Sequence, residues 1–130
     1  MRILIVEDNP IMQRMYARTM EESGMAVSLA EDGAGVQDIA LTDRPDIILM
    51  DMMLPGMNGI DALKTLKSNE QTAAIPVIML SAYDDPDFMQ QALDAGASRY
   101  LTKDSLEPRQ IAELVQQTLD PAKNTASAKE

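Results

Sequence analysis

Polar side chains follow several apolar runs of the sequence, and their types define the chemistry that the chain could perform. They are Glu7, Asp8, Asp51, Ser81 and Lys103. Three carboxylates that lie close together cannot all stay ionised without a counter-charge. Carboxylate oxygens suit magnesium, which takes one or two carboxylates directly and keeps several waters, and a lysine can supply further positive charge. The sequence therefore predicts a magnesium site if the fold brings these residues together.

The residues that the chain lacks restrict this chemistry further. It has no His and no Cys, which excludes a Ser-His-Asp triad, a phosphohistidine, a disulfide framework and a thiolate metal site. The formal net charge of -10 makes direct contact with nucleic-acid phosphates unfavourable. A cationic partner surface or a divalent cation is a better match for this charge.

Length and hydropathy indicate a single cytoplasmic domain. The chain has 130 residues, enough for one substantial core. No apolar run approaches the ~20 residues that a membrane span requires, and the first residues lead into a strand-like run rather than a signal peptide. We expect the domain to cover residues 1–120. Residues 121–130 are small and polar, which predicts a disordered tail or the start of a linker.

Short apolar segments are the strands expected to position the polar residues. They comprise residues 3–6, the segment around Val27 and Leu29, and residues 47–50, 76–80 and 100–102. Most are nearly continuous apolar runs, as in a sheet that is buried on both faces. The second is less uniformly apolar, which favours a position near the edge. Asp51 comes directly after the third run, so we expect its carboxylate to emerge just into solvent.

Helices are expected between the strands. Asn9 and Asp85, each followed by a proline, are predicted N-caps, and Asn58 is a third. Apolar residues at helical spacing predict the buried faces. These residues are Met12, Met15, Tyr16, Thr19, Met20, Val36, Ile39, Ala40, Ile60, Leu63, Leu66, Met89, Ala92, Leu93, Ile111, Leu114, Val115 and Leu119.

The alternation of strand and helix, repeated five times, predicts an α/β fold. Parallel strands need crossover connections, so the expected architecture is a doubly wound five-stranded parallel sheet with helices on both faces. Ligands of such sheets bind outside the carboxyl ends of the strands. The polar residues named above fall at those ends, which predicts that they converge on one rim.

Four motifs at successive strand ends resemble the receiver domain of two-component response regulators. They are residues 6–9 (VEDN), residues 51–59 (DMMLPGMNG), residues 81–82 (SA) and residues 100–103 (YLTK). The resemblance covers residues 1–119. It implies a flavodoxin-like fold with strand order 2-1-3-4-5.

The resemblance also implies a role for each polar residue. Asp51 would be the phosphoacceptor, taking a phosphoryl group from a histidine kinase, a histidine phosphotransfer protein or a small phosphodonor. Asp8, Asp51 and the main-chain carbonyl of Met53 would hold magnesium, and Glu7 would act mainly through a water. Lys103 and Ser81 would bind phosphoryl oxygens. The chain would catalyse its own phosphorylation and slow dephosphorylation, but it would not be a dedicated turnover enzyme.

The implied output is a shift between two conformations. Tyr100 matches the aromatic residue that turns inward when the Ser81 hydroxyl is drawn to the phosphate. The change would alter the fourth helix, fifth strand and fifth helix, the surface around Arg99, Leu106 and Arg109, where an effector would bind. A phosphorylation-dependent homodimer is one form that this output could take.

Two bulky residues predict slow loss of the phosphoryl group. Met53 and Tyr83 lie two positions after Asp51 and Ser81, and they offer little to orient an attacking water. Met50, Met52, Met53 and Met57 are close together in the sequence. We expect them to be adaptable packing residues rather than to have a redox role.

The chain departs from the family pattern after Lys103, where Asp104 replaces the usual proline. A cis bond at a non-proline residue costs ~2.5 to 4 kcal/mol, so we expect a trans bond and a rearranged loop, which leaves the reach of Lys103 open.

Three other functions compete with this interpretation. A flavin module would need a phosphate cradle after the first strand and more aromatic residues. An aspartyl phosphatase would need a second Asp at the position of Met53. A degenerate receiver would act only as a phosphorylation-independent docking module.

Overall fold

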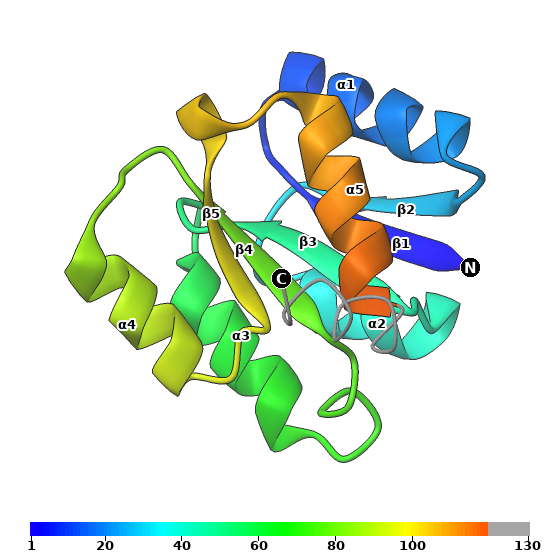
Figure 1. Ribbon diagram of the computed structural model, residues 1–130. Coiled ribbons are helices and arrows are strands. Elements are labelled where there is room, and N and C mark those ends of the chain that lie inside the picture. The colour runs from blue at the N-terminus through cyan, green and yellow to red at the C-terminus, as the bar shows by residue number, and fades with distance from the viewer. Residues whose placement is uncertain (120–130) are drawn as a thin grey trace.

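The computed structural model describes residues 1–119 as a parallel sheet covered by helices on both faces (Figure 1). The strands are β1 (Arg2–Val6), β2 (Ala26–Ala30), β3 (Ile47–Asp51), β4 (Val77–Ser81) and β5 (Arg99–Thr102). All are parallel, in the order β2-β1-β3-β4-β5. Fold class, strand order and the edge position of β2 are therefore as predicted.

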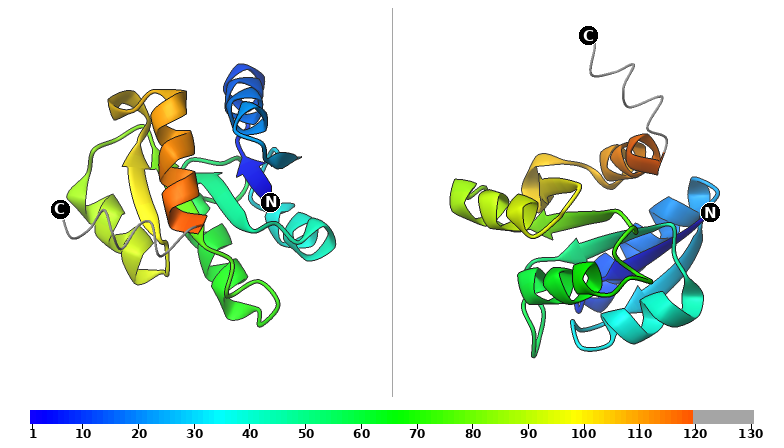
Figure 2. Two further views of the ribbon diagram at one scale, coloured as in Figure 1. Left: turned by 45° about the vertical axis from the view of Figure 1, so that its right-hand side comes forward. Right: turned by 90° about the horizontal axis from the view of Figure 1, so that it is seen from below.

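The helices form two layers (Figure 2). They are α1 (Pro10–Glu22), α2 (Val36–Asp43), α3 (Gly59–Ser68), α4 (Pro86–Asp94) and α5 (Pro108–Leu119), with a short 3-10 turn η1 (Lys103–Ser105) after β5. On one face, α1 and α5 pack against residues such as Ile3 and Ile5. On the other, α2, α3 and α4 pack against residues such as Leu4 and Val6. Successive side chains of a strand point to opposite faces, which is why neighbouring residues of β1 serve different layers.

The three predicted N-caps are confirmed. Asn9 Oδ1 accepts hydrogen bonds from the N–H groups of Ile11 (2.9 Å) and Met12 (3.2 Å). Asn58 Oδ1 accepts from the Asp61 N–H at 2.9 Å, and Asp85 Oδ1 accepts from the Asp87 N–H at 2.8 Å. These bonds satisfy backbone donors that a helix start leaves unpaired. Each cap therefore fixes the chain direction close to a strand end.

The prediction that Met89 and Leu93 are buried is wrong. Their exposed fractions are 41% and 42%, whereas Ala92 between them is fully buried. The helix α4 packs beside β5, which is an edge strand of the sheet. Only the face of α4 that carries Phe88, Ala92 and Ala95 therefore meets the core. The other predicted helical core positions are buried or half-buried.

Residues 120–130 lie outside the part of the chain that the structure describes, so the expected tail and the end of the domain stay predictions. Within residues 1–119, no helix is both long enough and apolar enough to cross a membrane.

Gly59 places α3 directly against the end of β3. Its N–H donates to the Met52 carbonyl at 2.8 Å. A Cβ atom at this position would lie 2.5 Å from the Asp51 carbonyl oxygen and 2.8 Å from the Met79 Cε. Only glycine allows this approach, because backbone and a buried side chain would both have to move for a larger residue.

We predict that Gly59→Ala lowers the free energy of unfolding by about 1–3 kcal/mol, because the added methyl group overpacks the contact with Asp51. Urea unfolding measures the change. Gly35→Ala is the matched control, since its Cβ would meet only the Asp32 carboxylate at 3.4 Å. Equal midpoints for the two variants would show that the close approach at Gly59 is not required.

Candidate functional site

The polar residues singled out in the sequence lie along one rim of the sheet. Glu7 and Asp8 follow β1, and Asp51 is the last residue of β3. Ser81 is the last residue of β4, and Lys103 comes directly after β5. The strands β1, β3, β4 and β5 are consecutive in the parallel sheet, so all these residues emerge on the same side.

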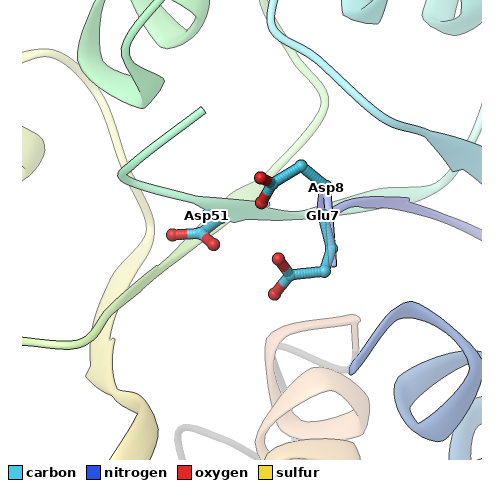
Figure 3. Close-up of side chains that lie close together, drawn as sticks. All are labelled: Glu7, Asp8 and Asp51. Atoms are coloured by element: carbon cyan, nitrogen blue, oxygen red, sulfur yellow. The ribbon is translucent and has the colours of Figure 1, made fainter. Parts of the chain in front are cut away.

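Three carboxylates gather at this rim (Figure 3). One oxygen each of Glu7, Asp8 and Asp51 lies within 4.8 Å of the others, which confirms the predicted cluster. Asp8 is exposed, whereas Glu7 and Asp51 are only 2% and 5% exposed. The expectation that Asp51 emerges into solvent is therefore wrong. Its carboxylate contacts Lys103 and the Met53 N–H, and every residue of β3 is buried.

Lys103 joins two of these carboxylates. Its Nζ donates to Asp51 Oδ2 at 2.7 Å and to Glu7 Oε1 at 2.8 Å. No peptide bond among the described residues is cis, so the bond to Asp104 is trans, as predicted. Replacement of the usual proline does not prevent the lysine from reaching the acceptor.

Burial and ion pairing oppose each other at this rim. Burial raises the pKa of Glu7, although hydrogen bonds from Lys103 and from the Asn9 N–H counteract the rise. Burial disfavours the charged form of Lys103, but its hydrogen bonds to Asp51 and Glu7 outweigh burial and raise its pKa. Lys103 therefore stays cationic at neutral pH. Its charge offsets part of the repulsion between the carboxylates.

Glu7 is held more firmly than its sequence context indicated. Besides the bond to Lys103, Oε2 accepts from the Asn9 N–H at 3.2 Å. The Glu7 main-chain carbonyl accepts from Gln13 Nε2 at 3.1 Å. Sequence reasoning missed Gln13, because a polar residue in the first turns of a helix looks like an ordinary solvent-exposed position.

Asp51 has a second contact, to the residue two positions after it. Its Oδ1 accepts from the Met53 N–H at 3.0 Å. The side chains of Met53 and Tyr83, the two positions expected to affect hydrolysis, are exposed by 60% and 56%. Both lie in loops that follow a strand carrying a site residue, β3 and β4 respectively.

The backbone of Tyr83 connects the two predicted switch residues. The hydroxyl of Ser81 is fully buried and accepts from the Tyr83 N–H at 3.0 Å. The Tyr100 hydroxyl donates to the Tyr83 carbonyl at 2.8 Å. Ser81 and Tyr100 are thus linked through one residue of the β4–α4 loop. No sequence signal identifies this link, because any residue type offers the same backbone groups.

Comparison with known proteins gives a consistent result. A family model described as the response regulator receiver domain matches residues 3–116. The phosphate regulon transcriptional regulatory protein PhoB of Pseudomonas aeruginosa is 38% identical over 109 residues, which cover 84% of this chain and 47% of PhoB. The protein PilH of the same species is 37% identical over 102 residues, covering 78% of this chain and 84% of PilH.

The structure of the chemotaxis response regulator CheY4 of Vibrio cholerae is also similar. Its TM-score is 0.83 at 27% identity, covering 89% of this chain and 96% of that one. The chain spans most of the length of PilH but less than half of the length of PhoB.

We predict that Lys103→Met lowers the free energy of unfolding at pH 7 by about 3 kcal/mol, because it leaves two buried carboxylates without their cation. In wild type Lys103 lowers the pKa of Glu7, so its removal raises the pKa of Glu7 further, and the carboxylate of the variant takes up a proton at a higher pH than that of wild type. The loss relative to wild type is therefore full above the folded-state pKa of Glu7 in the variant and shrinks as the pH falls through it toward the pKa of Glu7 in wild type. Urea unfolding at several pH values measures this; a loss that does not change with pH would contradict it.

Proposed function

Because the chain belongs to the family of response regulator receiver domains, we propose that Asp51 accepts a phosphoryl group and that this event switches a partner-binding surface. The observation that carries the proposal is the contact of Lys103 with Asp51 at 2.7 Å, beside the two further carboxylates of Glu7 and Asp8. A buried acceptor, a cation and an acidic cluster at one rim are the parts that phosphoryl transfer to a carboxylate requires.

The acidic cluster fits a magnesium ion. Its oxygens lie within 4.8 Å of one another, and an all-oxygen donor set suits a hard divalent cation. The proposed direct ligands are Asp8, Asp51 and the main-chain carbonyl of Met53. The two carboxylate oxygens of Glu7 accept hydrogen bonds from the Asn9 N–H and from Lys103, and the proposed role of Glu7 is to act through a water. When bound, magnesium neutralises charge that develops on the phosphoryl oxygens.

The proposed reaction uses an oxygen of Asp51 as the nucleophile. It attacks phosphorus of a partner's phosphohistidine; a P–O bond forms, the P–N bond breaks and the imidazole leaves. Lys103 moves from Asp51 to a phosphoryl oxygen and keeps its bond to Glu7. The Ser81 hydroxyl accepts from the Tyr83 N–H and can donate its own hydrogen to another phosphoryl oxygen. Partners of this reaction are a histidine kinase or a histidine phosphotransfer protein.

The proposed output surface comprises α4, β5 and α5. When Ser81 moves toward the phosphoryl group, the Tyr83 backbone follows, and its bond to Tyr100 is disturbed. β5 and α5 are also joined, because Arg99 Nε donates to Thr118 Oγ1 at 2.8 Å. Coupling of this kind amounts to ~1 to 3 kcal/mol, enough to change partner affinity by one or two decades.

The chemistry of α4 indicates which partner would bind there. Met89 and Leu93 are exposed, and residues 82–98 contain four Asp but no Lys or Arg. This acidic and apolar surface matches an effector segment, or a second copy of the chain, that offers basic and apolar side chains. Since the chain covers less than half of relatives such as PhoB, we extend no effector activity from them to this chain.

We predict that incubation with magnesium and acetyl phosphate adds one phosphoryl group to the wild-type chain and none to Asp51→Asn, because the amide is not a nucleophile for this reaction. Intact-mass spectrometry gives the result directly. A gain in neither protein would contradict the proposal and favour the alternative, a docking module that works without phosphorylation.

We also predict that magnesium stabilises the folded chain through Asp8. At a concentration tenfold above the dissociation constant, magnesium raises the free energy of unfolding by about 1.4 kcal/mol. The Asp8→Asn variant needs at least tenfold more magnesium than wild type for the same stabilisation. Asp38→Asn, at an exposed position of α2, needs the same concentration as wild type. Thermal unfolding across a magnesium titration measures both; equal responses of the two variants would place the ion elsewhere.

A further inference from the structure

Four methionines, Met50, Met52, Met53 and Met57, lie in the acceptor strand β3 or shortly after it, and one of them differs from the rest in its exposure. Met50 and Met52 are 0% and 6% exposed, and Met57 is half-buried against the same core. These three behave as the packing residues that the sequence predicts. Met53 does not, because 60% of its surface is exposed.

The position of Met53 relative to Asp51 is fixed by the backbone. Its N–H donates to Asp51 Oδ1 at 3.0 Å, so the main chain from which the Met53 side chain extends lies against the acceptor carboxylate. Together with Ser81, Met53 lines a groove of about 220 Å³ between α3 and α4. The exposed side chain of Met53 therefore starts next to Asp51 and borders the groove that Ser81 also lines.

We propose that Met53 is an oxidation site, and that its conversion to the sulfoxide by a hydroperoxide shortens the lifetime of the phosphoryl group on Asp51. The thioether sulfur attacks the terminal oxygen of the hydroperoxide. An S–O bond forms, the O–O bond breaks, and the proton of the terminal oxygen moves to the leaving oxygen, which departs as the alcohol, or as water in the case of hydrogen peroxide. Sulfur loses two electrons and the peroxide gains them, so no other reactant is needed.

Its exposure favours oxidation of Met53 over oxidation of the buried Met50 and Met52. Oxidation of Met50 or Met52 would place a polar oxygen in the core and requires the chain to open. The sulfoxide of Met53 stays in solvent and leaves the packing intact. A methionine sulfoxide reductase can reverse the change, so the sulfoxide of Met53 would be a reversible signal of peroxide.

The effect on lifetime rests on the proposed function of Asp51. A thioether is a weak hydrogen-bond acceptor, so Met53 gives an attacking water nothing to bind. A sulfoxide oxygen is a strong acceptor and can hold a water beside the phosphoryl group. Hydrolysis then becomes faster, by about three- to tenfold, less than the ~10²-fold of a full general base.

The first measurement is peptide mapping of the full chain after treatment with hydrogen peroxide. Met53 should gain one oxygen before Met50 and Met52 do, at a rate comparable to that of exposed Met89. Oxidation of Met53 no faster than that of Met50 would overturn the proposal. This result does not depend on whether Asp51 is phosphorylated.

The second measurement is the decay of the phosphorylated chain followed by intact mass. Peroxide treatment should shorten the lifetime of wild type and of Met89→Leu alike, but not that of Met53→Leu, which keeps its other methionines. Met53→Gln, which carries a neutral acceptor, should decay faster without peroxide. Equal lifetimes of treated wild type and treated Met53→Leu would overturn the effect on lifetime. A chain that accepts no phosphoryl group overturns the proposed function and this effect, and the peptide map alone then decides the oxidation site.

Discussion

One ammonium group shared by two buried carboxylates is the interaction on which the rim of this sheet depends. Lys103 lies 2.7 Å from Asp51 and 2.8 Å from Glu7, although it follows β5, whereas Asp51 ends β3 and Glu7 follows β1. Burying charges is costly unless they are paired and hydrogen-bonded. The parallel order of the strands brings the three groups to one side, and the lysine reaches across the end of β4 to both carboxylates.

Much of this arrangement could be predicted from the sequence. The alternation of strand and helix predicts the parallel sheet, and polar residues directly after buried strands predict the rim. Helical spacing was less informative for α4. It shows which side chains share a helix face, but not whether a neighbouring element covers that face, so Met89 and Leu93 were wrongly expected in the core. Asp51 was wrongly expected in solvent, because the sequence does not reveal that β3 is buried up to its last residue.

Backbone hydrogen bonds account for most of what the sequence could not indicate. The N–H and carbonyl of Tyr83 connect Ser81 to Tyr100, and the Met53 N–H binds Asp51. Such groups are the same in every residue, so no motif identifies them. They nevertheless offer the proposed physical route from the acceptor to α4, since movement of Ser81 would displace the same loop residue to which Tyr100 is bonded. The exposure of the Met53 thioether beside Asp51 likewise depends on the local backbone, which no motif reveals.

The central claim is that the carboxylate of Asp51, and not that of exposed Asp8, becomes the acyl phosphate. Borohydride reduction tests it most directly, because it converts an aspartyl phosphate to homoserine and so marks the residue. After phosphorylation with magnesium and acetyl phosphate, peptide mapping should find homoserine at residue 51 alone, and none in a sample without the phosphodonor. Homoserine at residue 8, at another acidic residue, or at no position would contradict the account.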